Sequence, residues 1–484
     1  MSFYLGIDIG TSSIKVILLD ADQHQHAVIS KPLTVSRPAP GWSEQAPTAW
    51  WQEVDAAVTE MAGQQPEKIS ALRAIGLSGQ MHGLVALDGR DQPLRDAILW
   101  NDTRSSAEAA ELQENHREFA RIGGNLVMAG FTAPKAVWMA RHEPELFAKI
   151  ETLLLPKDYI RLCLTGEKIS DMSDASGTLW LDIGQRCWSE KLLDICGLRL
   201  DHMPKLVEGS EVSAMLKPEL ARKWGIAGPV IVAGGAGDNA AAAIGLGLTA
   251  ADEGFVSLGT SGVVFTVTKG FAERADKAVH AFCHALPNSW HQMGVILSAS
   301  DSLSWLSDIT GQPVPDLLAQ MKPEDSTKCW PLFHPYLSGE RTPHNNPEAR
   351  GGFFGLSRRD DAGDLTRAVL QGVAFAMADA MAVLETSKTS ARQLVATGGG
   401  ANNMYWLTLI ASLTDCSIAV PEHTDIGAAM GAARLAMLAD GQPLAAVCTP
   451  PALSHIVRPD AELASTLQPA YRLSQSLYAH LSTV

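Results

Sequence analysis

The sequence is poor in cysteine, and the cysteines that it has follow no recognised pattern. Seven of them are scattered along 484 residues, and none forms a C-x-x-C pair. Secreted disulfide scaffolds and thiolate zinc sites both need closely spaced cysteines, so the sequence speaks against both classes. We therefore expect a cytoplasmic protein whose thiols stay reduced.

Long apolar runs and an excess of positive charge are also missing. No stretch is long enough to cross a bilayer without meeting a glycine or a charge, and the N-terminal sequence MSFYLGIDIG lacks the basic segment of a signal peptide. The 53 acidic side chains outnumber the 38 basic ones, which gives a net charge of −15. Such a surface disfavours nucleic acid and anionic membranes as partners, although backbone N–H groups can still bind a small phosphate.

An internal repeat is the first positive feature. Hydrophobic residues make up 46% of the chain, as in globular proteins, and its length favours two domains. Residues 4–19 and 255–267 both read as two aliphatic strands joined by a Gly-Thr-Ser turn. We therefore predict two similar domains, an N-terminal one over residues 1–247 and a C-terminal one over residues 248–484.

Strand-like and helix-like segments alternate around the two repeated hairpins. Aliphatic or β-branched runs predict strands, and apolar residues at helical spacing predict helices. The alternation predicts an α/β fold with sheets covered by helices. The strands are expected at 71–77, 83–87, 229–233 and 394–396, and the helices at 239–246, 364–386 and 403–413.

The two Gly-Thr-Ser turns are candidates for phosphate binding. A turn between strands presents successive N–H groups to a small concavity that suits phosphate oxygens, and hydroxyl groups add donors. No Walker motif G-x-x-x-x-G-K-[ST] occurs. The alternative is a pair of plain hairpin turns, which the recurrence half a chain apart makes less attractive. The candidate residues are Gly10, Thr11, Ser12, Gly259, Thr260 and Ser261.

Two aspartates are candidates for the charge chemistry of phosphoryl transfer. Asp8 stands on an otherwise aliphatic strand, where an unpaired buried carboxylate is costly and a Mg²⁺ ion bridging to ATP phosphates compensates for its charge. Asp238 follows the small residues 233–237, which leave room for a hydroxyl group that gives up its proton to the carboxylate. The alternatives are an exposed strand end for Asp8 and a helix N-cap for Asp238.

Two further segments carry candidate ligand contacts. In Ser78-Gly-Gln-Met-His-Gly83, His82 could donate a hydrogen bond to a sugar oxygen and Met81 could shape the pocket, although a loop histidine is more often solvated. Glycines 398–400 follow a predicted strand and would let an adenosine lie flat against the backbone, with Asn403 available to the adenine or the ribose. A lone triple glycine is a weak signal without the G-x-G-x-x-G spacing.

Together these residues resemble the FGGY carbohydrate kinases, which share the actin-like, ribonuclease H-like ATPase core. The resemblance covers essentially the whole chain in order, and two longer signatures strengthen it. The matching segments are Asp8-Ile-Gly-Thr-Ser12, 130–138, Gly237-Asp-Asn239, Leu258-Gly-Thr-Ser261, 351–371 and Gly398-Gly-Gly-Ala401.

The resemblance implies two actin-like α/β domains that flank a catalytic cleft, with ATP and Mg²⁺ as cofactors. It implies that Asp238 is the catalytic base, that Met81, His82 and Asn239 contact the sugar together with Asp238, and that Asp8 is linked to the metal. The two turns then correspond to phosphate hairpins, and Gly399, Gly400 and Asn403 fall where the family holds adenosine. A homodimer is a further expectation from the family.

Two segments, 78–83 and 336–344, resemble most closely those of the bacterial members that phosphorylate D-xylulose. The resemblance therefore implies D-xylulose as the sugar. A kinase for another ketose such as L-xylulose or ribulose, or for a polyol, is one alternative, and an actin-like ATPase that is not a kinase is another. Asp301 departs from the pattern, because a small or apolar residue is expected there.

Overall fold

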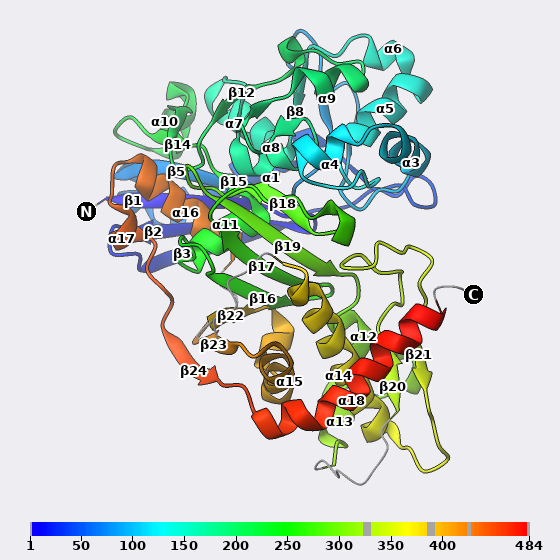
Figure 1. The fold of residues 1–484 in the computed structure, drawn as a ribbon. Coiled ribbons are helices and arrows are strands. Elements are labelled where there is room, and N and C mark those ends of the chain that lie inside the picture. Colours follow the sequence, from blue (N-terminus) through cyan, green and yellow to red (C-terminus); the bar gives the residue numbers. More distant parts are fainter. Residues whose placement is uncertain (1, 323–330, 385–392, 424–426, 482–484) are drawn as a thin grey trace.

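Two seven-stranded sheets organise the computed structural model, which describes residues 2–322, 331–384, 393–423 and 427–481. The first sheet has the order β13-β14-β5-β1-β2-β3, and β15 also pairs with β5. Its blue hairpin strands run through the middle of Figure 1. Its strands are β1 (Phe3–Ile9), β2 (Ser13–Asp20), β3 (Gln25–Pro32), β5 (Leu72–Gly79), β13 (Val212–Met215), β14 (Ile231–Ala233) and β15 (Ala236–Gly237).

The second sheet repeats the plan of the first. Its order is β18-β19-β17-β16-β22-β23-β24. In each sheet an antiparallel hairpin, β1–β2 or β16–β17, is extended on one side by two parallel strands, β5 and β14 or β22 and β23. Both predicted hairpins and the predicted α/β class are thus confirmed. The strands are β16 (Gly254–Leu258), β17 (Gly262–Thr268), β18 (His280–Cys283), β19 (Trp290–Ile296), β22 (Gln393–Thr397), β23 (Ser417–Pro421) and β24 (Leu453–Val457).

Both faces of the first sheet are covered, which explains why β1 is apolar on both sides. The odd-numbered side chains from Phe3 to Ile9 pack with helix α1 (Pro47–Gln64), through Trp50 among others. The face that bears Tyr4 packs with α11 (Asp238–Gly245) and α16 (Ala428–Ala439). Because side chains alternate along a strand, Asp8 points to this second face.

Helix α16 comes from the C-terminal part of the sequence but lies on the N-terminal sheet. Its backbone approaches β1 and β5 so closely that a Cβ at Gly6 would lie 2.0 Å from the Ala429 carbonyl oxygen, and one at Gly76 would lie 1.8 Å from that of Ala432. A Cβ at Gly431 would likewise lie 1.7 Å from the carbonyl oxygen of Ala241 in α11. Glycine is therefore required where α16 meets the sheet and α11.

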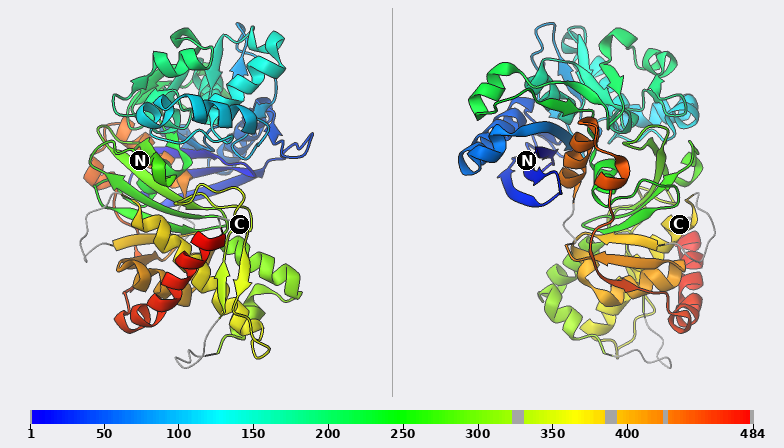
Figure 2. Two further views of the ribbon diagram at one scale, coloured as in Figure 1. Left: turned by 45° about the vertical axis from the view of Figure 1, so that its right-hand side comes forward. Right: turned by 90° about the vertical axis from the view of Figure 1, so that its left-hand side faces the viewer.

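The second sheet packs against α14 (Ala362–Ala382) and α15 (Met404–Thr414), which share its apolar cluster. The predicted helices at 364–386 and 403–413 correspond to these two, although residues 385 and 386 lie outside the described residues. Helix α18 (Ala461–Leu481) packs on the outside of this half (Figure 2). The remaining elements of this half are α12 (Ser300–Thr310), α13 (Val314–Ala319), β20 (Leu332–His334), β21 (Gly352–Phe354) and α17 (Leu444–Val447).

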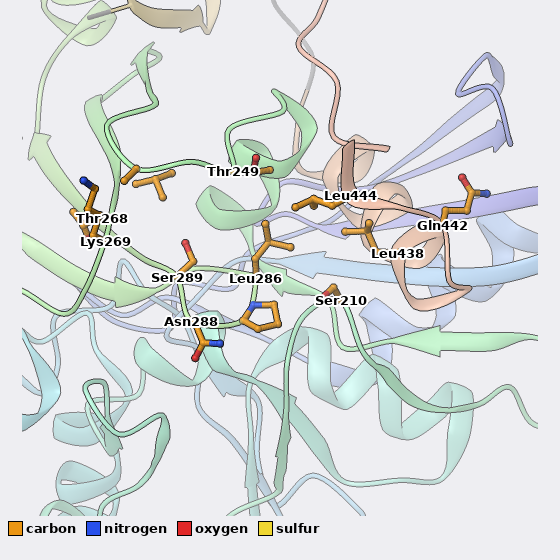
Figure 3. A pocket seen from close by; sticks show the side chains of 13 residues that line it. Ser210, Thr249, Thr268, Lys269, Leu286, Asn288, Ser289, Leu438, Gln442 and Leu444 are labelled. Carbon is orange, nitrogen blue, oxygen red and sulfur yellow. The ribbon is translucent and has the colours of Figure 1, made fainter. Parts of the chain in front are cut away.

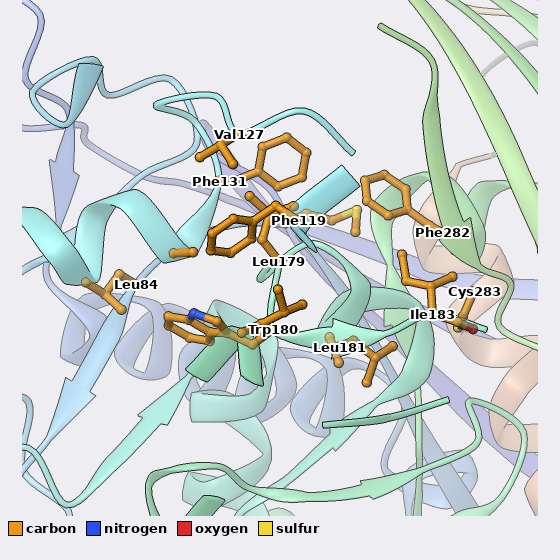
Figure 4. Packing of buried hydrophobic residues seen from close by; sticks show 14 of the residues in the cluster. Leu84, Phe119, Val127, Phe131, Leu179, Trp180, Leu181, Ile183, Phe282 and Cys283 are labelled. Atoms are coloured by element: carbon orange, nitrogen blue, oxygen red, sulfur yellow. The ribbon is translucent and has the colours of Figure 1, made fainter. Parts of the chain in front are cut away.

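The segment between β5 and β13 builds an additional layer on the N-terminal half, at the top of Figure 1. Its apolar side chains, including Phe131, form one cluster with Phe282 of β18, so that it packs against the second sheet (Figure 4). The elements of the layer are β6 (Val85–Leu87), β7 (Ala97–Ile98), α3 (Ser106–Asn115), α4 (Glu118–Gly123), α5 (Thr132–His142), α6 (Pro144–Phe147), β8 (Thr152–Leu154), α7 (Pro156–Thr165), β9 (Ile169–Asp171), α8 (Met172–Ser176), β10 (Leu181–Asp182), β11 (Cys187–Trp188), α9 (Glu190–Ile195) and β12 (Lys205–Val207).

Candidate active site

The strand pairing brings Asp8 and Asp238 to the same place. Ser78 of β5 is opposite Asp8 of β1 on one side and Ala236 of β15 on the other. Asp238 follows β15 directly as the first residue of α11, which covers the face to which Asp8 points. The negative charge of Asp8 is one of the causes that raise the pKa of Asp238, as expected for two neighbouring carboxylates.

Asp238 is half-buried, and its pKa is raised from 3.8 to about 6, first by loss of solvation and then by the charge of Asp8. Two hydrogen bonds oppose this shift, since the backbone and side-chain N–H groups of Asn239 donate to Oδ1 at 2.7 and 2.9 Å. The N-cap of α11 is Gly237 and no side chain caps the helix. The alternative of Asp238 as a helix cap is therefore wrong.

Asp8 is a half-buried carboxylate with one buried, spare oxygen. Its Oδ1 has no hydrogen-bond partner in the structure. Burial raises the pKa of Asp8, while the Ser78 hydroxyl and the charge of Lys15 act in the opposite direction. The alternative of an exposed strand end is thus wrong, and the unpartnered oxygen fits a hard cation or a water molecule bound to one.

Met81 and His82 follow β5 and lie beside the Asp238 loop. A Cβ at Gly237 would lie 2.8 Å from Cγ and Sδ of Met81, and one at Gly177 would lie 2.7 Å from Nδ1 of His82. His82 is half-buried, and its backbone φ of 69° is in the left-handed region. The structure therefore brings Met81, His82, Asp238 and Asn239 together.

The protonation state of His82 differs from the one that the role expected from the sequence requires. Burial lowers the pKa of His82 to about 3, so the ring is neutral at physiological pH. Its Nδ1 lies 2.7 Å from the Gly177 carbonyl oxygen, which can only accept, so Nδ1 carries the single ring proton. Nε2 is then a hydrogen-bond acceptor, and not the donor that the sequence suggested.

A buried charge cluster holds the backbone behind Asp238, and sequence analysis missed it. Arg161 donates to the carbonyl oxygens of Ala233 and Gly234, and Ser173 accepts from the Gly237 N–H at 3.1 Å. Lys157 pairs with three fully buried carboxylates, Asp158, Asp171 and Asp174. Burial raises the pKa of Asp174 well above its usual range, and the charge of Lys157 opposes this shift. The available signal was a run of charged residues among apolar ones at 156–161 and 171–174.

The first Gly-Thr-Ser turn is fixed by side chains that the motif did not include. The Thr11 hydroxyl donates to Gln80 Oε1 at 2.8 Å and accepts from Trp100 Nε1 at 3.0 Å, while Gln45 Nε2 donates to the Thr11 carbonyl at 2.8 Å. Ser12 is exposed at the tip of the turn. The turn is therefore rigid, although the Thr11 hydroxyl is already occupied.

The second turn lies between α12 and the glycine segment. The carbonyl oxygens of Gly259 and Thr260 accept from Ser300 N–H and Ala299 N–H at 2.9 and 2.8 Å, while the side chains of Thr260 and Ser261 are exposed. Asp301, the residue that departs from the family pattern, is the second residue of α12, and its carboxylate accepts a hydrogen bond from Ser298 just before the helix. Its backbone N–H donates to the Thr260 carbonyl at 3.3 Å, so the residue contacts the turn through its backbone.

The glycine segment packs on the strand that leads to the second turn. Gly398 has a φ of +85°, and a Cβ there would lie 2.9 Å from the Leu258 carbonyl group, whereas a Cβ at Gly399 would meet nothing. Gly400 also packs on Leu258. The structure thus brings Gly399 and Gly400 next to Gly259, but no hydrogen bond joins this region to the turn at 10–12 among the described residues.

Asn403 has a structural role that the sequence did not reveal. Its Oδ1 accepts from the Trp406 N–H at 3.1 Å and so caps α15. The NH₂ group of the amide and a second lone pair of Oδ1 remain for a nucleotide. The N-cap signal, an asparagine just before an apolar helical run, was present in the sequence.

A separate cavity of about 500 Å³ contains none of the predicted site residues (Figure 3). Its lining includes Leu286, Leu438 and Gln442. Gln442 donates a hydrogen bond to the Tyr4 hydroxyl, at the start of β1, whereas Asp8 is near its end. The cavity is therefore distinct from the site around Asp8 and Asp238.

The two sheets share one strand order, and each carries an open Gly-Thr-Ser turn. A pair of carboxylates lies beside one of these turns. Together these features define a two-lobed α/β protein suited to phosphoryl transfer. Residues 3–245 match the N-terminal domain of the FGGY family of carbohydrate kinases, and residues 254–439 match its C-terminal domain. The chain therefore belongs to the FGGY family of carbohydrate kinases, as the motifs indicated, and it uses ATP.

Individual relatives share the whole length of the chain. The xylulose kinase of Escherichia coli K12 is 46% identical over 485 residues, which cover 99% of both chains. A crystal structure described as a xyloylose kinase from Brucella ovis is 49% identical, with a TM-score of 0.96 and 99% of both chains covered. A gluconate kinase from Lactobacillus acidophilus has a TM-score of 0.91 at 25% identity, with 99% of this chain and 98% of its own covered.

Proposed function

We propose that this chain transfers the γ-phosphoryl group of ATP to the C5 hydroxyl of D-xylulose, giving D-xylulose 5-phosphate and ADP. Identity of 46 to 49% over the full length of xylulose kinases supports the substrate. The observation that carries the mechanism is the half-buried Asp238 beside Asp8, whose pKa of about 6 leaves it ionised at neutral pH and able to take a proton.

Asp238 is the general base of the proposed reaction. Its carboxylate accepts the proton of the C5 hydroxyl while the hydroxyl oxygen forms a bond to the γ-phosphorus and the bond to the β-phosphate oxygen breaks. Asn239 fixes Oδ1 through two hydrogen bonds, so Oδ2 is the oxygen that faces the sugar. The buried cluster around Arg161 keeps the loop that carries Asp238 in place.

The remaining residues divide the two ligands between them. Met81, His82 and Asn239 contact the sugar, with His82 Nε2 as an acceptor. The N–H groups of residues 10–12 and 259–261 bind the phosphates, and Gly399, Gly400 and Asn403 hold the adenosine. Asp8 holds Mg²⁺, directly or through water, since its Oδ1 is buried without a partner. When bound, Mg²⁺ supplies positive charge that neutralises the phosphate oxygens.

An ADP-release assay with MgATP tests the proposal. It is run with D-xylulose, L-xylulose, ribulose, a polyol, gluconate and no sugar, on the wild type and on Asp238→Ala. Strong stimulation by D-xylulose that Asp238→Ala abolishes, with ATP binding intact by calorimetry, is the expected result. Stimulation by another sugar alone would reject D-xylulose, and turnover indifferent to every sugar would indicate an actin-like ATPase that is not a kinase.

The proposal also extends to the cellular compartment and the oligomeric state of the protein. Both substrates are metabolites of the cytoplasm, where we place the protein. We also propose a homodimer, which light scattering coupled to gel filtration measures directly. A monomeric mass at micromolar concentration would reject it without affecting the proposed reaction.

A further inference from the structure

Arg341 belongs to the segment 336–344, which the proposed reaction has left without a role. Its two neighbours are tied to β19: Leu297 N–H donates to Glu340 Oε1 at 3.1 Å, and Thr342 N–H donates to the Val295 carbonyl at 3.0 Å. The backbone on both sides of Arg341 is therefore fixed. Its side chain is partly exposed and leaves β19 towards β18.

One nitrogen of the Arg341 guanidinium group contacts the His280 ring, whose orientation is fixed by Asn125. Arg341 Nη1 lies 3.3 Å from His280 Nε2, and His280 Nδ1 lies 2.9 Å from Asn125 Oδ1. The Asn125 amide NH₂ donates to two carbonyl groups, so its oxygen faces His280 and must accept from Nδ1. The imidazole is then neutral with Nε2 as acceptor, and the chain of hydrogen bonds aims Arg341 from the C-terminal half at the N-terminal half.

The rest of the guanidinium group is open to solvent and has no hydrogen-bond partner among the described residues. In the described part of the chain it forms no ion pair. Burial raises the pKa of the adjacent Glu340 to about 8, so this carboxyl group is protonated at neutral pH and leaves the charge of Arg341 uncompensated. Two other arginines differ, since Arg104 pairs with Asp102 and Arg186 with Glu208. A guanidinium group that is fixed in place but keeps donors open to solvent is suited to a ligand with acceptor oxygens.

The surroundings of Arg341 place that ligand in the sugar site. The His280 ring is 5.6 Å from the Phe131 ring, which is 4.6 Å from the His82 ring. Figure 4 shows Phe131 and Phe282 at this junction of the two halves. The charge of Arg341 is also among the causes that lower the pKa of His82. Because β19 separates β18 from β17, Arg341 reaches away from the phosphate turn at 259–261.

We propose that Arg341 donates hydrogen bonds to the sugar oxygens remote from the phosphorylated hydroxyl, namely the ketone and C1 hydroxyl of a 2-ketose. The inference rests on the proposed sugar kinase function. A ketone oxygen can only accept and a guanidinium group can only donate, so the two match. A site built to bond an oxygen discriminates strongly against a substrate that lacks it. Arg341 thus makes the C-terminal half part of the sugar site.

The test compares Arg341→Gln and Arg341→Lys in the full-length chain, with Arg350→Gln as the control. Arg350 is an exposed arginine of the same loop. Steady-state rates are measured with D-xylulose and with 1-deoxy-D-xylulose, which lacks the C1 hydroxyl, together with the KM for ATP and the midpoint of thermal unfolding. We expect Arg341→Gln to raise the KM for D-xylulose at least tenfold and that for the deoxy sugar less than threefold. Arg341→Lys should recover part of the loss, and Arg350→Gln should change neither value.

Other outcomes overturn the inference. An equal loss with both sugars and a lower unfolding midpoint would make Arg341 structural, and a raised KM for ATP at unchanged sugar KM would make it a phosphate ligand. An unchanged KM for both sugars in Arg341→Gln would also refute it. Wild-type turnover with another sugar only would reject D-xylulose instead, and the same comparison on that sugar and its deoxy form then decides the role of Arg341.

Discussion

The proposed base, Asp238, shows how a single residue obtains its chemistry from its surroundings. Burial and the neighbouring Asp8 raise its pKa to about 6, a value that leaves the carboxylate ionised at neutral pH but more basic than an exposed aspartate. Asn239 opposes the shift with two hydrogen bonds. The pKa of Asp238 thus reflects a balance between these opposing effects, and substitution of the neighbouring residues should shift it.

The first prediction concerns the pH dependence of the rate. Below pH about 6 the Asp238 carboxylate takes up a proton and can no longer act as a base. We expect kcat/KM for the sugar to fall tenfold per pH unit on this acid limb. Replacing Asn239 by Ala removes a donor that lowers the pKa of Asp238, so the limb should move to higher pH. A limb that stays in place in Asn239→Ala would contradict this prediction.

A second prediction links the same residue to stability. Because the folded-state pKa of Asp238 lies above 3.8, its ionised form destabilises the folded state, fully above pH about 6 and not at all below pH 3.8. Asp238→Asn should therefore raise the free energy of unfolding at pH 7.5 by about 1 to 3 kcal/mol, with no gain at pH 4. Urea unfolding at both pH values measures it, and an equal change at both would show that packing and not charge is responsible.

The candidate residues were predictable where a motif carries them, and their exact roles were not. Asp8 and Asp238 stand out in the sequence because carboxylates interrupt apolar or small-residue segments. The direction of the His82 hydrogen bond depends on Gly177, which is 95 positions away, and the occupation of Thr11 depends on Gln80 and Trp100. Contacts between residues this far apart in the chain leave no local pattern in the sequence.

At the scale of elements, the packing of α16 on β1 and β5 depends on glycine. The third prediction is that Gly76→Ala destabilises the fold by about 3 kcal/mol or prevents folding, because its Cβ would lie 1.8 Å from a backbone oxygen. Gly63→Ala is the matched control, since a Cβ there meets nothing in helix α1 and should stabilise by about 0.5 to 1 kcal/mol. Urea unfolding of both variants would contradict the prediction if their midpoints agreed.

Most long elements followed from sequence periodicity, and the short ones did not. The two hairpins, β14, β22, α11, α14 and α15 lie where strand or helix patterns predicted them. The two-residue strands β4 (Glu44–Gln45) and β7, which pair with each other across 52 positions, have no pattern of their own and form only because the surrounding layer brings them together. Position in the tertiary structure, and not propensity, determines such elements.

At the scale of the molecule, helix α16 ties the two halves of the sequence together. The fourth prediction is that residues 1–247 alone do not form a stable domain, because the glycine-lined face of β1 and β5 and the alanines of α11 would lose their cover. A second fragment, in which a Gly/Ser linker joins residue 247 to residues 427–441, restores α16 and should be soluble with a cooperative unfolding transition. Cooperative unfolding of residues 1–247 without α16 would show that the helix is dispensable.

The position of α16 also has a consequence for the order in which the protein can fold on the ribosome. The glycine-bearing strand β5 ends at Gly79, but the helix that covers it ends only at Ala439. At about 5 to 20 residues per second, these first strands of the sheet emerge roughly 20 to 70 s before α16 does. Helix α11 ends at Gly245 and covers part of the same face earlier, but the surface of β1 and β5 that α16 buries stays uncovered during this interval. Until α16 has emerged, the nascent chain therefore presents an apolar surface that is exposed to chaperones and to aggregation.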